Sequence, residues 1–147
     1  MRLDSLQKFN TVVMGDVLEH LKDDDIALRR VNSFLLKKGR VIISVPYHPS
    51  LWTKSDVVRH HHRRYTKKML KKKLEKAGFR VQRIFFWNML AVFPLVLSKI
   101  FNFRTPHEKI SKSFMNELLY GYMIIENQLP LPFGSALMCI AIKEKEL

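Results

Sequence analysis

Thr11-Val12-Val13-Met14-Gly15-Asp16-Val17-Leu18-Glu19-His20 is the stretch that decides the fold. Its first four residues form a short, apolar run rich in β-branched side chains, which predicts a buried strand of a parallel sheet. The chain must turn at Gly15-Asp16, and a short loop follows. Ligands of open α/β sheets bind in the crevice beyond the carboxyl ends of the strands. We therefore expect Asp16 to His20 to lie at the functional edge of a sheet.

The residues that follow His20 predict a helix. Asp23 or Asp24 can cap its first amide groups, and negative charge there complements the helix dipole. Asn32 is expected to point away from the core, together with Arg29 and Arg30. The residues expected to face the core are Ala27, Val31, Phe34 and Leu35.

A second strand follows this helix. Lys37-Lys38-Gly39 is expected to end the helix, with cations at its negative end and a glycine free to turn left-handed. Arg40 to Pro46 then predicts a second buried strand, and proline ends its ladder. Strand, helix and strand joined by short loops form a βαβ unit, which implies parallel pairing.

The remainder of the chain predicts one more helix and two more strands. Residues 47–65 are expected to form a long polar loop. Thr66 can cap a helix that ends at Gly78, with lysines on its outer side. The residues of this helix expected to face inward are Leu70, Leu74 and Ala77. The two further strands are expected over Arg80–Trp87 and Ala136–Ile142.

Size and composition predict a single domain over residues 1–147. This length is enough for one hydrophobic core, and 47% hydrophobic residues is ordinary for a globular protein. Lys and Arg number 26 against 13 for Asp and Glu, a formal charge of +13 that favours anionic partners. Cys139 is the only cysteine, so no internal disulfide forms and a cytoplasmic location is expected. The first ten residues lack the apolar core of a signal peptide.

An apolar segment over residues 89–103 precedes the last strand. It is about long enough to span a bilayer, but it contains Pro94, Lys99 and Asn102. A helical hairpin packed on the domain is favoured over a membrane span, with peripheral contact to a lipid surface as a further expectation. Residues 88–130 are therefore expected to form a helical insertion before the last strand.

Several motifs resemble class I S-adenosylmethionine-dependent methyltransferases. They are Val12 to His20 with its Asp-x-Leu-Glu-His signature, Leu35 to Pro46, His61-His62-Arg63-Arg64-Tyr65-Thr66, Glu75 to Phe79, and Leu131-Pro132-Phe133-Gly134. The resemblance implies an α/β fold, a partial Rossmann-like sheet that comprises strands four to seven with the last strand antiparallel. It also implies a methyltransferase that uses S-adenosylmethionine and acts on a small-molecule or lipid-like acceptor.

One part of the family pattern is missing from the sequence. Only five glycines occur, and none forms the G-x-G pattern of the cofactor loop. That loop would lie upstream of Met1, which leaves three explanations: a truncated sequence, a partner chain that supplies the rest, or a domain that persists without binding the cofactor as its relatives do. Truncation is the favoured explanation. The first strand would then have an unpaired edge, and the isolated chain is expected to bind the cofactor poorly.

The resemblance also implies site residues. Cofactor contacts are expected from Gly15, Asp16, Val17, Leu18, Glu19 and His20. Methyl transfer depends mainly on alignment in a dry pocket. A general base is optional, and His20 or His61 is the best candidate because histidine titrates near neutrality. No metal site is expected, because neighbouring histidines cannot all reach one ion and no zinc-type spacing occurs.

The loop over residues 47–65 is expected to face the acceptor. The residues predicted to contact the acceptor are Tyr47, Trp52, Arg63, Arg64 and Tyr65, and packing of the last three against the next helix is the alternative. Two other classes of function stay open: a nucleic-acid-binding module, which is less favoured because the lysine-rich helix is more ordinarily a solvated face, and a membrane-surface module.

Overall fold

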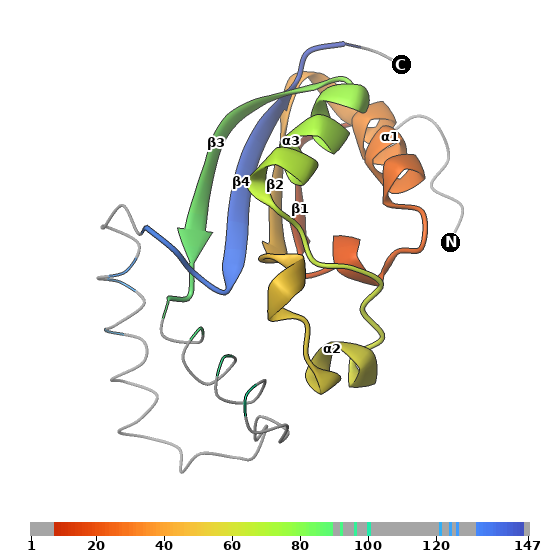
Figure 1. Ribbon diagram of the computed structural model, residues 1–147. Coiled ribbons are helices and arrows are strands. Elements are labelled where there is room, and N and C mark those ends of the chain that lie inside the picture. Colours follow the sequence, from red (N-terminus) through yellow and green to blue (C-terminus); the bar gives the residue numbers. More distant parts are fainter. Residues whose placement is uncertain are drawn as a thin grey trace.

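The computed structural model describes residues 8–89, 92, 96, 100, 121, 124, 126 and 132–145, and shows one four-stranded sheet (Figure 1). The strand order is β1–β2–β4–β3, with β1 at Phe9–Gly15, β2 at Leu35–Pro46, β4 at Ala136–Lys143 and β3 at Phe79–Trp87. β1 and β2 are parallel, and β4 runs antiparallel to both of its neighbours. The parallel pair and the antiparallel last strand confirm the predicted topology.

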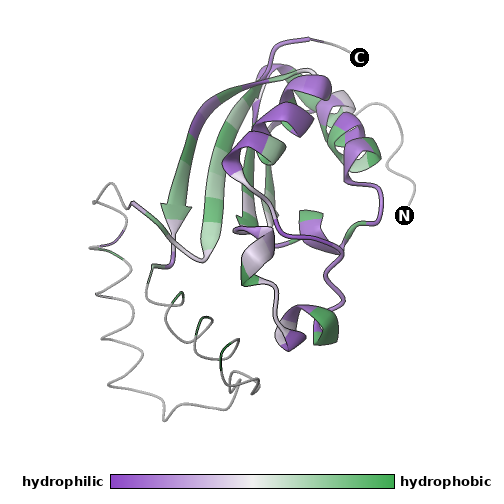
Figure 2. Ribbon diagram, viewed as in Figure 1, coloured by the Kyte–Doolittle hydropathy of each residue, from purple (hydrophilic) through white to green (hydrophobic). Residues whose placement is uncertain are grey.

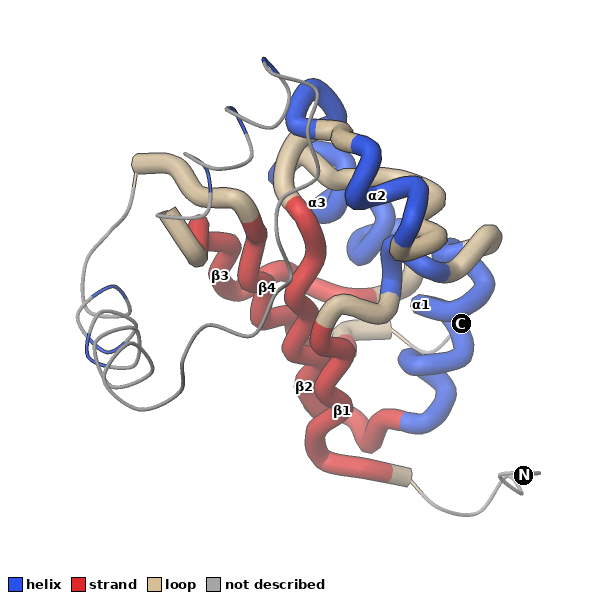
Figure 3. The backbone as a smooth tube through the Cα atoms, turned by 90° about the horizontal axis from the view of Figure 1, so that it is seen from below, coloured by secondary structure: helices blue, strands red, loops and turns tan. Residues whose placement is uncertain are grey.

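Helices α1 (Asp24–Phe34) and α3 (Lys67–Lys76) cover one face of this sheet, as the view from below shows (Figure 3). Apolar residues concentrate on the strands and on the inner sides of these helices (Figure 2). The core forms where Leu28, Leu70 and Leu74 meet the buried side chains of β2 and β4. Those buried strand residues alternate along each strand and are Val41, Ile43, Val45, Leu137, Cys139 and Ala141.

The predicted inward face of α1 is correct only in part, because Ala27 and Val31 pack against the core as predicted but the most buried residues are others. The helix begins as predicted, with Asp23 as the cap that accepts a hydrogen bond from the Ile26 N–H at 3.0 Å. Its buried residues include Leu28 and Asn32, so the prediction that Asn32 points to solvent is wrong. The Asn32 amide donates to the carbonyl oxygens of Ala77 at 2.9 Å and Lys145 at 3.1 Å. A polar side chain is stable in this core because both partners are in place.

The predicted end of α1 is also wrong. The helix ends at Phe34, and Leu35 already belongs to β2. Lys38, rather than Gly39, adopts the left-handed conformation, with φ of 62°. Gly39 is needed for a different reason: a Cβ there would lie 2.8 Å from the Leu36 carbonyl oxygen and 3.2 Å from that of Asn10. Position 39 therefore requires glycine because neighbouring backbone segments approach it too closely for a Cβ atom.

The second half of the described chain follows the predictions more closely. The Thr66 hydroxyl caps α3 by accepting a hydrogen bond from the Met69 N–H at 3.2 Å, and Gly78 ends the helix region with φ of 78°. Leu70, Leu74 and Ala77 are buried as predicted. Residues 47–65 are not entirely irregular, because they contain the 3₁₀ helix η2 (Pro49–Leu51) and the short helix α2 (Lys54–Val58).

β1 lies at the edge of the described sheet. It is the predicted strand, but of its residues only Met14 is buried, and Val13 is 68% exposed. Most of the apolar segment 89–103 and of the predicted insertion 88–130 lies outside the described residues. Within the described part of the chain, no helix is long and apolar enough to cross a membrane.

Candidate functional site

β1 and β2 end at the same edge of the sheet because they are parallel. Gly15 of β1 pairs with Ser44 near the end of β2. The loop after β1 contains the 3₁₀ helix η1 (Leu18–His20), and the segment after β2 contains α2; both lie beyond the strand ends in Figure 1. The residues between these strands and helices therefore meet at the edge where α/β sheets bind ligands.

Asp16 turns the chain out of β1. Its φ of 50° lies in the left-handed region, which aspartate tolerates better than most residues. The Asp16 N–H donates to the Ser44 carbonyl oxygen at 3.2 Å and to Ser44 Oγ at 3.0 Å. The Ser44 hydroxyl donates in return to Asp16 Oδ1 at 2.7 Å. These three hydrogen bonds hold the loop in place while the Asp16 residue stays exposed.

Glu19 is buried beside this turn. Leu18 anchors the loop in the core, and the carboxylate of Glu19 is only 1% exposed. Among the described residues, no group hydrogen-bonds to Glu19 Oε2. Burial raises the pKa of Glu19 from 4.5 to about 7, and the nearby charge of Asp16 adds to this effect.

His61 approaches the same place from the segment after α2. Its Nδ1 lies 2.9 Å from Asp56 Oδ1. Asp56 also accepts two hydrogen bonds from Arg64, both at 2.9 Å, and one from the Thr53 N–H at 2.7 Å. Although burial acts to raise it, these hydrogen bonds hold the pKa of Asp56 below its ordinary value. Burial lowers the pKa of His61 below 6.5 despite the carboxylate, so the imidazole is neutral at pH 7.

Glu19, His20 and His61 converge at this edge. One ligand atom from each lies within 4.8 Å of the other two. The rings of His20 and His61 meet edge to face, with centroids 4.7 Å apart. The His62 N–H donates to the Glu19 carbonyl oxygen at 2.8 Å, which joins the two loops. The structure thus brings both predicted catalytic histidines together, next to a buried carboxylate.

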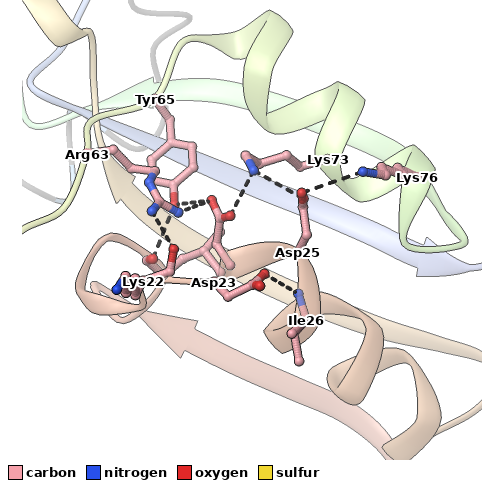
Figure 4. A network of polar contacts seen from close by, with 10 residues as sticks. Lys22, Asp23, Asp25, Ile26, Arg63, Tyr65, Lys73 and Lys76 are labelled. Atoms are coloured by element: carbon pink, nitrogen blue, oxygen red, sulfur yellow. Dashed lines mark hydrogen bonds and ion pairs between the residues drawn. The ribbon is translucent and has the colours of Figure 1, made fainter.

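Three of the residues predicted to contact the acceptor form polar contacts inside the protein. Tyr65 is fully buried, and its hydroxyl donates to Asp24 Oδ2 at 2.8 Å. Arg63 forms an ion pair with Asp24 at 2.8 Å, and Lys73 from α3 joins the same carboxylate (Figure 4). Arg64 is buried against Asp56. Their polar groups are therefore engaged inside the protein, in line with the packing alternative, and contact with an acceptor stays a prediction for them.

Tyr47 and Trp52 remain predictions as acceptor contacts. Both are half-buried in the segment that follows β2. The Tyr47 ring packs edge to face on Phe86, with centroids 4.8 Å apart.

Two further predicted cofactor contacts lie at the end of the first strand. Gly15 ends β1, and Val17 is an exposed apolar residue beside Asp16.

Sequence reasoning missed Asp56, which orients His61. A signal was present: Thr53 and Asp56 have the spacing of a capping box, and the structure shows both of its hydrogen bonds. That spacing predicts a helix start. It does not predict that the aspartate also contacts an arginine and a histidine beyond the helix.

The sequence matches the family described as "Methyltransferase domain" over residues 2–84, more than half of the chain. This protein belongs to that family. No curated protein matches the sequence.

Solved structures show the same fold. A protein of Bacillus halodurans described as a methyltransferase aligns at 15% identity and a TM-score of 0.58, over 95% of this chain and 66% of its own. A SAM-dependent methyltransferase of Archaeoglobus fulgidus aligns at 20% identity and a TM-score of 0.52, over 93% of this chain and 60% of its own. Phosphoethanolamine N-methyltransferase 2 of Haemonchus contortus also aligns at 20% identity and a TM-score of 0.52, over 93% of this chain and 34% of its own. The chain thus spans less than two thirds of each of these relatives.

Proposed function

We propose that this chain contributes to methyl transfer from S-adenosylmethionine, as the part of a methyltransferase domain that carries the Asp16–His20 loop. The observation that carries this proposal is the position of that loop. Ser44 holds it at the carboxyl edge of two parallel strands, within the segment that matches the family. This edge is where α/β folds bind nucleotide-like cofactors.

The loop offers groups that fit such a cofactor. Asp16 presents an exposed carboxylate, and Val17 presents an exposed apolar side chain next to it. A carboxylate suits hydroxyl or amino groups, and an apolar surface suits an adenine ring. Bound S-adenosylmethionine would supply the methyl group on a sulfonium centre. The residues proposed to bind it are Gly15, Asp16, Val17, Leu18, Glu19 and His20.

His61 is the better placed of the two candidate bases. Asp56 fixes one of its ring nitrogens, and the other remains available to accept a proton from an acceptor. Its lowered pKa keeps the imidazole neutral, which is the form that a base needs. His20 is more exposed and has the weaker claim.

We propose a small-molecule or lipid-like acceptor. The Haemonchus contortus relative is described as a phosphoethanolamine N-methyltransferase, and its structures contain S-adenosylmethionine in one case and phosphomonomethylethanolamine with S-adenosylhomocysteine in another. The net charge of +13 suits an acceptor that carries phosphate or another anion. Tyr47 and Trp52 are the proposed contacts, and a cytoplasmic location is part of the proposal.

The test uses the gene product as the cell makes it. A tag at the carboxyl end retains any residues that precede Met1, and ultraviolet light cross-links tritiated S-adenosylmethionine to the purified protein. Asp16→Asn keeps the left-handed turn and removes the charge. We expect it to weaken labelling about tenfold or more, the usual cost of a hydrogen bond to a charged group.

Asp23→Asn is the matched control, because Asp23 caps α1 and should leave labelling unchanged. A folded wild-type protein that takes no label would contradict the proposal, as would equal labelling of the Asp16 variant. Calorimetry on the 147-residue chain alone is expected to show weak binding or none.

An anionic macromolecular surface is a second candidate partner. The outer side of α3 is strongly hydrophilic in Figure 2, and its exposed cations are Lys67, Lys68, Lys71, Lys72 and Lys76. Binding of this kind weakens steeply with salt, whereas cofactor binding is nearly insensitive to it. Titrations with duplex DNA and with anionic vesicles at two salt concentrations would separate these possibilities.

A further inference from the structure

We propose that Glu19, His20 and His61 bind a divalent first-row transition metal ion, with Zn²⁺ as the representative case. One ligand atom of each residue lies within 4.8 Å of the other two. Metal–ligand bonds of about 2.0–2.2 Å hold ligand atoms about 3–4 Å apart. Small side-chain rotations therefore suffice to close this cluster around an ion.

The buried carboxylate of Glu19 is the first feature that indicates a metal ion. Glu19 is almost completely shielded from solvent, and no described group hydrogen-bonds to its Oε2. A buried carboxylate oxygen without a partner is costly, and buried charges are normally paired or bound to metal. A cation at the position facing His20 and His61 supplies the missing partner.

The second argument is the orientation of His61. Asp56 binds Nδ1 of the ring at 2.9 Å, which directs Nε2 away from Asp56. Asp56 is itself held by Arg64 and by the Thr53 N–H. Metal-binding histidines are commonly held in this way, with a carboxylate on the second ring nitrogen that fixes the tautomer.

The third argument is the way in which the backbone joins the two loops. The His62 N–H donates to the Glu19 carbonyl oxygen at 2.8 Å, so η1 and the histidine segment are held together. His20 remains exposed on one side of the cluster, which gives an ion a route from solvent. His60 and His62 are also exposed, and neither belongs to the cluster.

The ligand set indicates the kind of metal. Two imidazoles and one carboxylate suit zinc and its transition-metal neighbours, whereas Ca²⁺ and Mg²⁺ prefer oxygen ligands. Three protein ligands leave a coordination position for water or for an oxygen of a bound molecule. Ligation uses the nitrogen lone pair that a base needs, so the base role proposed above for His61 applies to the metal-free protein.

The run of three histidines does not bind the ion as a unit, because only His61 of the three belongs to the cluster. The other ligands come from the loop after β1, far away in the sequence. Only the fold shows that they meet.

The experiment titrates Co²⁺ and Zn²⁺ into EDTA-treated, dialysed protein. We expect one equivalent of Co²⁺ to produce visible d–d absorption bands, and Zn²⁺ to displace it. Glu19→Gln, His20→Ala and His61→Ala should each weaken binding about tenfold to a hundredfold or more, judging from the cost of losing even an outer partner of a ligand. His60→Ala and His62→Ala are matched controls from the same segment and should bind as tightly as the wild type.

Circular dichroism establishes that each variant is folded. A folded wild type that binds no stoichiometric Co²⁺ would overturn the proposal. Equal losses in the His60 or His62 variants would also overturn it, because they would assign binding to the histidine run rather than to the cluster. The cobalt spectrum does not depend on S-adenosylmethionine, so this result is separate from the test of methyl transfer.

Discussion

Asp24 and Glu19 are two buried carboxylates near each other in the sequence, with opposite surroundings. Asp24 is 3% exposed and Glu19 is 1% exposed. Asp24 accepts hydrogen bonds from Tyr65 at 2.8 Å and Lys73 at 2.8 Å, and forms an ion pair with Arg63 at 2.8 Å. Glu19 Oε2 has no such partner among the described residues.

The pKa values of the two groups differ accordingly. Burial acts to raise both, but hydrogen bonds from Lys73, Arg63 and Tyr65 bring the pKa of Asp24 below 3.8. For Glu19 burial prevails, and the pKa rises to about 7. Burial to the same degree thus has opposite outcomes, because the partners decide the charge. Asp24 connects α1 to α3 through its ion pair with Lys73, whereas Glu19 Oε2 has no partner among the described residues.

The largest expected effect is the loss of Asp24. Asp24→Ala leaves Lys73, Arg63 and the Tyr65 hydroxyl without their shared acceptor. Breaking a buried pair costs about 3–5 kcal/mol of unfolding free energy. We expect about 3 kcal/mol, because Lys73 and Arg63 are 23% and 26% exposed. Urea denaturation measures this, and a loss below about 1 kcal/mol would show that the cluster is not structural.

The acid limb of the stability profile provides a second measurement at the same residue, with a different variant. The folded pKa of Asp24 is lower than 3.8, so its contribution is present above 3.8 and is lost as the pH falls through the folded value. Asp24→Asn should therefore lose less stability than the wild type on acidification below 3.8. Equal acid slopes would contradict this.

Glu19→Gln should have the opposite sign. The folded pKa of Glu19 is raised from 4.5 to about 7, so the wild type loses stability as the pH rises through this range. In EDTA at about pH 8 the variant should be more stable by about 3–4 kcal/mol, at roughly 1.4 kcal/mol per pKa unit. At about pH 4 the two proteins should be nearly equal. Thermal melts at both pH values check this, and destabilisation at about pH 8 would reveal a protein partner for Glu19.

The smallest expected effects come from two exposed carboxylates, Asp23 and Glu75. Asp23→Ala removes the cap of α1, in which Asp23 accepts from the Ile26 N–H at 3.0 Å. Loss of such a cap costs about 1 kcal/mol. Glu75→Ala provides a lower reference, because the exposed Lys71–Glu75 pair should contribute less than about 0.5 kcal/mol. If Asp23→Ala or Glu75→Ala lost as much unfolding free energy as Asp24→Ala, buried and exposed carboxylates would not differ in their contribution to stability.

Local patterns predicted most of the described secondary structure. β-branched runs predicted β1 and β2, and Asp23 and Thr66 predicted two helix starts. The boundary between α1 and β2 was wrong because Leu35 pairs with Phe9 on β1, so a contact outside the helix ends it. Asn32 was assigned to solvent for the same kind of reason, since its partners Ala77 and Lys145 lie far along the chain.

The candidate site was likewise predicted from the sequence only in part. The edge position of the Asp16–His20 loop follows from a strand that ends in Gly-Asp, and the two histidines were named on chemical type. The sequence left two alternatives open for Arg63, Arg64 and Tyr65, acceptor contact or internal packing, because arginine and tyrosine suit a substrate and a buried carboxylate equally. Only the structure shows their contacts with Asp24 and Asp56.

The sequence by itself determined the order of the four strands, α1 and α3 along the chain, the capping residues Asp23 and Thr66, and the loop that follows the first strand. These features depend on periodicity and on hydrogen bonds between near neighbours, which the order of residues already contains. Only the tertiary structure decided which carboxylates are paired, and that Glu19 and His20 lie beside His61. Charge state and ligand geometry depend on distances through space, and folding alone determines those distances.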